Sequence, residues 1–169
     1  MFLYVLRHGD AVQNSSLHDS ERPLSDLGKL QAEAAGRFLR SSNIRVDRIL
    51  SSPLIRAVET ATIVQKALNL SYAEQSEYLV PGTRKNELFE LINSKNGNSI
   101  LLAGHEPHLS ETVSLLLTGR EDLPLQFRKC SLACLVASEP VRAGHAALQW
   151  LVTTEQMQLL RREGLPSSR

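Results

Sequence analysis

Four side chains of the types that bind and transfer phosphoryl groups stand at the ends of apolar runs in this sequence. Arg7 and His8 follow the run FLYVL, Arg56 lies shortly after RILSSP, and His105 follows ILLAG. A guanidinium matches the geometry of phosphate oxygens, and an imidazole can attack phosphorus or donate a hydrogen bond. Such cations would repel one another unless an anion joined them, and the residue types indicate a phosphate-like anion.

The predicted elements bring these side chains to one edge of a sheet. FLYVL, VDRILSS (46–52) and NSILLAG (98–104) read as buried strands, and helical periodicity follows each of them. Alternating strands and helices predict right-handed crossovers and a parallel sheet, and ligands bind outside the carboxyl ends of such strands. Residues 71–83 read as a loop with at most a short strand, before a helix within 83–95.

Two helices have predicted start signals. Ser25 can cap the first, and its apolar positions recur at helical spacing: Leu27, Leu30, Ala34, Phe38 and Leu39. For the second helix we expect Ser52 as N-cap and Pro53 at the first helical position. The second start places Arg56 in the first turn of its helix.

The C-terminal part changes character. CSLACLVAS (130–138) and AALQWLV (146–152) predict a long antiparallel hairpin, TEQMQLL a last helical turn, and 163–169 a frayed tail. Cys130 and Cys134 are both placed on the strand, and same-face positions at that spacing lie about 13 Å apart, too far for a disulfide. We therefore expect reduced thiols. The expected fold class is α/β, with a mostly parallel sheet, helices on both faces and this hairpin, in one domain spanning 1–169.

Composition excludes several kinds of partner. The 169 residues include 19 basic and 18 acidic ones, for a net charge of +1, so no overall field favours nucleic acid or an anionic membrane. No apolar stretch is long enough for a signal-peptide core or a membrane span. A cytoplasmic monomer is the expectation, and dinucleotide, P-loop and α/β-hydrolase motifs are absent.

The sequence resembles the histidine phosphatase superfamily, which has the phosphoglycerate mutase-like three-layer fold, and within it the small SixA-type phosphohistidine phosphatases. Four stretches carry the resemblance in the family's order: LYVLRHGDA, RPLSDLGKLQA, LSSPLIRAVETA and LLAGHEPHLSE. The resemblance implies that His8 is the nucleophile that becomes phosphorylated. It also implies that Arg7, Arg56 and His105 bind the phosphoryl oxygens, with no metal or other cofactor.

The general acid is where the sequence departs from the larger branches of the family, which place an acid in an inserted cap. The connection between Leu70 and Leu88 is too short for such a cap. Four carboxylates remain as possible acids: Glu77, Asp10, Asp19 and Glu106. Because an imidazole is a far less basic leaving group than an alkoxide, a missing acid fits phosphohistidine as substrate, and an open pocket fits a protein partner.

Other histidines and one asparagine allow a simpler interpretation. His108 lies in HEPH, where the histidines are three apart and not four as in the HExxH zinc helix, so a pocket-rim or structural role is expected. His18 and His145 are expected in exposed loops. Asn14 stands where larger relatives carry a phosphate-binding asparagine, and it could equally cap its loop.

The sequence thus predicts a phosphatase that hydrolyses phosphohistidine on a signalling or phosphotransfer protein through phospho-His8. A phosphatase for small phosphate esters is the alternative enzyme, and it needs one of the four carboxylates as acid. A phosphate-binding module without turnover is the alternative outside catalysis.

Overall fold

The structure is a computed structural model, and it describes residues 1–162. Its strands are β1 (Phe2–Arg7), β2 (Arg48–Ser51), β3 (Glu74–Gln75), β4 (Ser99–Gly104), β5 (Leu132–Ala137) and β6 (Ala146–Val152). Its helices are α1 (Asp26–Ser41), α2 (Ile55–Ala67), α3 (Lys85–Asn93), α4 (His108–Thr118) and α5 (Thr154–Arg162), with 3-10 turns η1 (Asp19–Glu21) and η2 (Glu77–Leu79). The tail predicted to fray lies outside the described residues.

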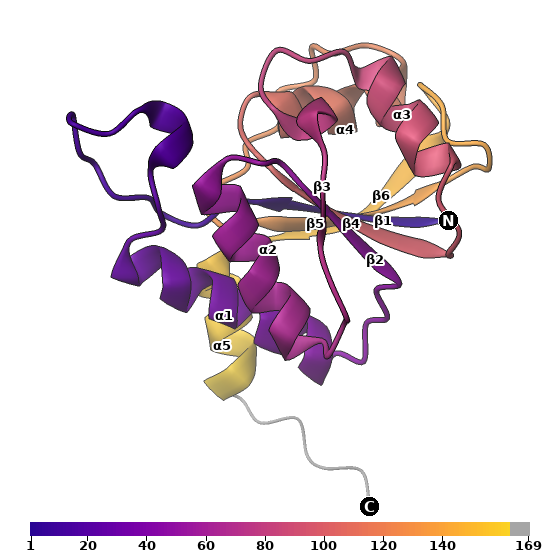
Figure 1. Ribbon diagram of the computed structural model, residues 1–169. Coiled ribbons are helices and arrows are strands. Elements are labelled where there is room, and N and C mark those ends of the chain that lie inside the picture. The colour runs from indigo at the N-terminus through magenta and orange to yellow at the C-terminus, as the bar shows by residue number, and fades with distance from the viewer. Residues whose placement is uncertain (163–169) are drawn as a thin grey trace, which may run out of the picture.

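One mixed sheet has the strand order β3-β2-β4-β1-β5-β6. The first four strands are parallel, and β5 and β6 add an antiparallel hairpin at the other edge. Figure 1 shows α3 and α4 on one face of the sheet and α1, α2 and α5 on the other. The predicted α/β class, the parallel order and the C-terminal hairpin are confirmed.

The central strand β1 is buried on both faces, as its unbroken apolar sequence predicts. Leu3 and Val5 pack into the core under α3 and α4, whereas Tyr4 and Leu6 pack into the core under α1, α2 and α5. Successive side chains of a strand point to opposite faces, so one short apolar run anchors both layers. The residues that follow β1 therefore start from a rigid support.

The buried face of α1 differs from the prediction. Leu27 and Leu30 are 58% and 56% exposed, and the residues that face inward are mostly small ones, including Gly28 and Gly36. A Cβ atom on Gly28 would lie 1.9 Å from the carbonyl oxygen of Asp10. The buried face of α1 has small residues because the helix approaches the loop after β1 too closely for a larger side chain.

The C-terminal segment corrects two further expectations. Cys130 precedes β5, with a φ of 54°, so only Cys134 lies on the strand; both thiols are free and buried. The last helix, α5, has nine residues and is longer than the single turn expected. Within residues 1–162, no helix combines the length and apolar character needed to cross a membrane.

Candidate active site

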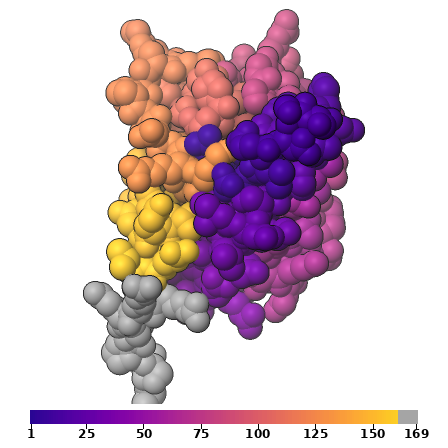
Figure 2. Space-filling model, turned by 90° about the vertical axis from the view of Figure 1, so that its left-hand side faces the viewer, coloured from indigo at the N-terminus to yellow at the C-terminus, as the bar shows by residue number. Residues whose placement is uncertain are grey.

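The carboxyl ends of β1, β2 and β4 are level with one another. The register pairs Arg7 with Gly104 and Ser51 with Ala103, so the next residues of the three strands emerge at one edge. Figure 2 looks onto this edge, where a small area of indigo N-terminal atoms surfaces between the indigo loop and the orange segment before β5. The ring centroids of His8 and His105 are 4.9 Å apart here.

His8 is held with one ring nitrogen available. The side chain is 4% exposed, and Nδ1 lies 2.6 Å from the carbonyl oxygen of Gly9. A carbonyl can only accept, so Nδ1 carries the proton and Nε2 keeps its lone pair. Burial, followed by the charges of Lys129 and His105, lowers the pKa of His8 to about 2. The imidazole is therefore neutral and presents a lone pair at neutral pH.

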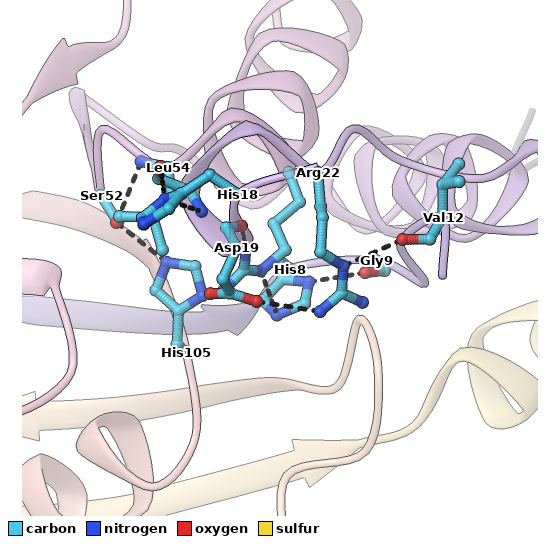
Figure 3. A network of polar contacts seen from close by, with 11 residues as sticks. His8, Gly9, Val12, His18, Asp19, Arg22, Ser52, Leu54 and His105 are labelled. Atoms are coloured by element: carbon cyan, nitrogen blue, oxygen red, sulfur yellow. Dashed lines mark hydrogen bonds and ion pairs between the residues drawn. The ribbon is translucent and has the colours of Figure 1, made fainter. Parts of the chain in front are cut away.

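Arg56 faces that lone pair. It comes from the first turn of α2, is buried, and its Nε donates to Nε2 of His8 at 3.3 Å. Figure 3 labels His8, on which this bond ends, together with Asp19 and Arg22. Its Nη1 and Nη2 donate to the carbonyl oxygen and the carboxylate of Asp19, at 2.5 and 2.9 Å. Arg22 donates to the same carboxylate at 2.9 Å. Arg56 thus joins the ring of His8 to the loop of residues 10–23.

Arg7 is positioned by the segment that precedes β5. Its Nη1 donates to the carbonyl oxygen of Phe127 at 2.6 Å, and its Nε is buried without a hydrogen-bond partner among the residues that the structure describes. A buried guanidinium N–H without a partner is costly, and an anion at this edge would satisfy it.

His105 sits opposite, and its neighbour corrects a sequence prediction. Nε2 of His105 lies 2.9 Å from the hydroxyl oxygen of Ser52, and Nδ1 is buried without a partner in the described chain. Ser52 is not the N-cap of α2, because its own N–H still bonds to the sheet at Ala103; Leu54 occupies the cap position. Burial and the charge of Arg56 lower the pKa of His105 to about 3. The imidazole of His105 is therefore neutral near pH 7 in this structure.

The four candidate acids lie in different surroundings. The carboxylate of Asp10 accepts from the hydroxyl of Ser25 at 2.6 Å, and Ser25 is the N-cap of α1, as predicted. Glu77 is exposed in η2. Burial raises the pKa of Asp19, but its ion pairs with Arg56 and Arg22 together lower the pKa by more, so the net shift is downward. Asp19 is therefore a poor proton donor.

Glu106 is the carboxyl group best suited to holding a proton. It is half-buried, accepts from the backbone N–H of Ser110 at 3.3 Å and is close enough to Arg7 to interact with its charge. Burial is the largest influence and raises the pKa of Glu106.

The remaining residues have structural contacts. Asn14 is exposed, and its side-chain oxygen accepts from the N–H of Ser16, which caps the loop. His108 is fully buried, with Nε2 3.0 Å from the carbonyl oxygen of Tyr78. His18 and His145 are exposed, as expected.

Sequence reasoning missed two contributors: Ser52 and Thr60. Thr60 lies one turn after Arg56, accepts from the N–H of Gly9 and donates to the carbonyl of Arg56, so it ties α2 to the loop that bears His8. Its spacing from Arg56 was the available signal. Within residues 1–162, no group of three or more histidine, cysteine or acidic side chains is placed to hold a metal ion.

Comparisons with known proteins identify the family to which the chain belongs. Residues 3–78 match the model of the histidine phosphatase superfamily (branch 1). The chain is 30% identical over 155 residues to "Phosphohistidine phosphatase SixA" of Escherichia coli (strain K12), covering 89% of this chain and 92% of that protein. It is 30% identical over 149 residues to a SixA homologue of Haemophilus influenzae, covering 80% and 88%.

Solved structures give the same result. The protein histidine phosphatase SixA complexed with tungstate superposes with a TM-score of 0.82 at 26% identity, covering 91% of this chain and 97% of that one. This likeness and the match to the Escherichia coli protein extend well beyond the N-terminal half matched by the family model. The chain therefore belongs to the histidine phosphatase superfamily, in its SixA-type branch.

Proposed function

We propose that the protein is a phosphatase that removes phosphoryl groups from histidine side chains of another protein, through a covalent intermediate on His8. The observation that carries this proposal is the lone pair on Nε2 of a neutral, buried His8, aligned on Arg56 at 3.3 Å. A deprotonated nitrogen beside a guanidinium is suited to attack the phosphorus of an anionic group.

In the first step Nε2 of His8 forms a bond to phosphorus while the bond from phosphorus to the leaving nitrogen breaks. The electron pair of that bond stays with the departing imidazole, which takes up a proton from solvent. Arg7, Arg56 and His105 stabilise the charge on the three equatorial oxygens of the phosphoryl group. A dianion beside His105 also favours its protonated form, opposing the effect of Arg56.

In the second step water attacks phosphorus and the bond to Nε2 breaks. The water loses a proton, orthophosphate leaves, and His8 returns with the lone pair that it had at the start. Dividing hydrolysis in this way replaces one high barrier with two lower ones. Every group in this scheme is a residue of the chain, the substrate or water, so no metal is required by it.

Two features favour phosphohistidine as substrate. Only β3 and η2 lie between α2 and α3, so the edge near His8 has no inserted cap there and a side chain of a partner protein can reach it. The nearest carboxylate to Arg56, Asp19, is ionised by its two arginine partners and cannot easily protonate an alkoxide. The names of the two SixA relatives point to the same substrate class.

A phosphatase for small phosphate esters is the second candidate, and Glu106 favours it. Because burial raises its pKa, this carboxyl group can hold the proton that an alkoxide needs. In that case Glu106→Gln would reduce ester hydrolysis strongly and leave phosphohistidine hydrolysis nearly unchanged.

The test compares substrates on one preparation. A phosphohistidine-bearing phosphotransfer protein and p-nitrophenyl phosphate are supplied to the wild type and to His8→Asn, and released orthophosphate is measured. We expect a higher kcat/KM for phosphohistidine and no turnover by the variant. Faster ester hydrolysis would support the second candidate, and phosphate binding without turnover of either substrate would identify a binding module.

A further inference from the structure

A short turn, residues 127–131, is fastened to the two residues that begin the site. Arg7 donates from Nη1 to the carbonyl of Phe127 and from its backbone N–H to the carbonyl of Ser131, at 2.6 and 3.2 Å. The N–H of Cys130 donates to the carbonyl of His8 at 3.3 Å. The turn therefore has a fixed position relative to the nucleophile.

Buried side chains of the turn also hold it in place. Phe127 is fully buried in the core under α3 and α4, and Cys130 is fully buried in a cluster with Leu24 and Ala32. Between them, Lys129 is half-buried, and its carbonyl accepts from the hydroxyl of Thr154 at 3.0 Å. The backbone of Lys129 is therefore held on both sides, between two buried side chains.

Lys129 adds a positive charge to a site that already has several. Its charge acts on both His8 and His105, and Arg7, Arg22 and Arg56 act on it. Asp10 is the acidic group that opposes them, and it does not form an ion pair with Lys129 among the described residues. A half-buried ammonium held among guanidiniums is unfavourable unless an anion binds there.

We propose that Lys129 is a further substrate-binding residue, whose ammonium contacts a non-bridging oxygen of the phosphoryl group alongside Arg7 and Arg56. The inference deepens the proposed function, on which it rests only for the identity of the anion. It adds a cation from the segment before β5 to a set that otherwise comes from β1, α2 and the end of β4.

The charge of Lys129 should make anion binding depend on pH. Burial and then the charge of Arg7 lower the pKa of Lys129 to about 8. His8 and His105, with pKa values of about 2 and 3, do not titrate near that pH, and the other charged groups that act on Lys129 are Arg7, Arg22, Arg56 and Asp10. Affinity for an anion should therefore fall as the pH rises through about 8.

The experiment measures tungstate binding by calorimetry for the wild type, Lys129→Met, Lys129→Arg and the matched control Arg128→Met. Arg128 is the exposed neighbour, so its variant removes the same charge from the same turn without entering the site. At pH 7, Lys129→Met should raise the Kd at least about tenfold, as expected for a lost hydrogen bond between charged groups, while Arg128→Met stays within about twofold.

Two further outcomes keep the inference separate from folding and from the proposed function. Lys129→Arg retains a charge at high pH, so from pH 7 to pH 9.5 its Kd should rise less than that of the wild type, a shift that a structural role would not produce. Equal Kd values for Lys129→Met and Arg128→Met, or identical pH profiles for Lys129→Arg and wild type, would overturn the inference. Lys129-dependent tungstate binding without phosphohistidine turnover would overturn the proposed function alone.

Discussion

Charged side chains are paired differently at the two ends of the parallel strands. The end at which these strands begin is called the amino edge, and the end at which they finish is called the carboxyl edge. At the amino edge, the carboxylate of Asp47 accepts from the N–H groups of Asn98 and Ser99 at 2.7 and 3.0 Å. Lys95 pairs with Glu74 at 2.6 Å. Each of these charges has a protein partner, and each contact ties neighbouring elements together.

At the carboxyl edge, several basic side chains lack a partner in the described chain. Arg7 and His105 keep buried nitrogens without partners in the described chain, and Lys129 forms no ion pair there. Asp19 neutralises only Arg56 and Arg22. The difference indicates that charges at the amino edge hold the fold together, whereas several at the carboxyl edge lack a protein partner, as the proposed anion site requires.

The largest expected effect comes from the close approach at the carboxyl edge. Gly28→Ala would place a Cβ 1.9 Å from the backbone of Asp10, which has no flexible end to move aside. We expect a loss of about 3 kcal/mol or more in the free energy of unfolding, the upper range for overpacking. Urea denaturation measures it. Gly82→Ala is the control, since it meets no neighbour and costs only about 1 kcal/mol for its positive φ. Equal losses would contradict the account.

The next prediction compares the effect on kcat/KM of replacing an arginine at each edge. Arg56→Lys loses the planar fork that contacts both His8 and Asp19, so kcat/KM should fall about a hundredfold. Steady-state kinetics with a phosphohistidine protein measures this. Arg48→Lys at the amino edge, which loses a contact to the carbonyl of Asn96, should stay within about twofold. Similar losses for both variants would remove the distinction between the edges.

Lowering the pH has a smaller expected effect on stability per residue. The native pKa values of His8 and His105 lie far below those of unfolded histidine, so the unfolded chain takes up protons below pH 6.5 before the native one does. Stability is therefore complete above pH 6.5 and falls as the pH drops, by roughly 2 kcal/mol per histidine at pH 5.

Urea denaturation at pH 7.5 and pH 5 tests this loss. His8→Asn and His105→Asn should each lose less stability between the two pH values than the wild type does. The exposed His145→Asn is the control and should keep the wild-type loss. Wild-type losses in all three variants would mean that the site histidines are not buried in the neutral form.

The smallest effect belongs to the amino edge. Lys95→Met removes the ion pair with Glu74, whose side chains are 19% and 33% exposed. Ion pairs near the surface contribute little to stability, so the free energy of unfolding should change by less than about 1 kcal/mol, and kcat/KM should not change. A tenfold fall in kcat/KM would show that the two edges are coupled.

The sequence predicts the site well where strand and site residue are adjacent in the chain. Unbroken apolar runs lead directly into Arg7, His8 and His105, so locating the strands also locates these side chains. The same reasoning fails where contacts between distant segments decide. Leu27 and Leu30 have helical spacing and are exposed, because Gly28 must meet the loop after β1.

Ser52 and Lys129 show the same limit. A serine before proline is a common helix cap, but here a bond to Ala103 keeps Ser52 on the sheet, and the histidine at the end of β4 becomes its partner. Lys129 follows no motif, and its place depends on bonds from the turn to Arg7 and His8. Neither contact has a signal in local spacing.

The most direct test of the account is rapid quenching during turnover of a radiolabelled phosphohistidine protein. We predict a phosphoryl group on the enzyme that survives base and is lost in acid, reaches at most one per chain, and maps to His8 by mass spectrometry. His8→Asn should carry none, and Lys95→Met should carry as much as the wild type. Turnover without a phosphorylated enzyme, or a label on another residue, would contradict the assignment of His8 as nucleophile.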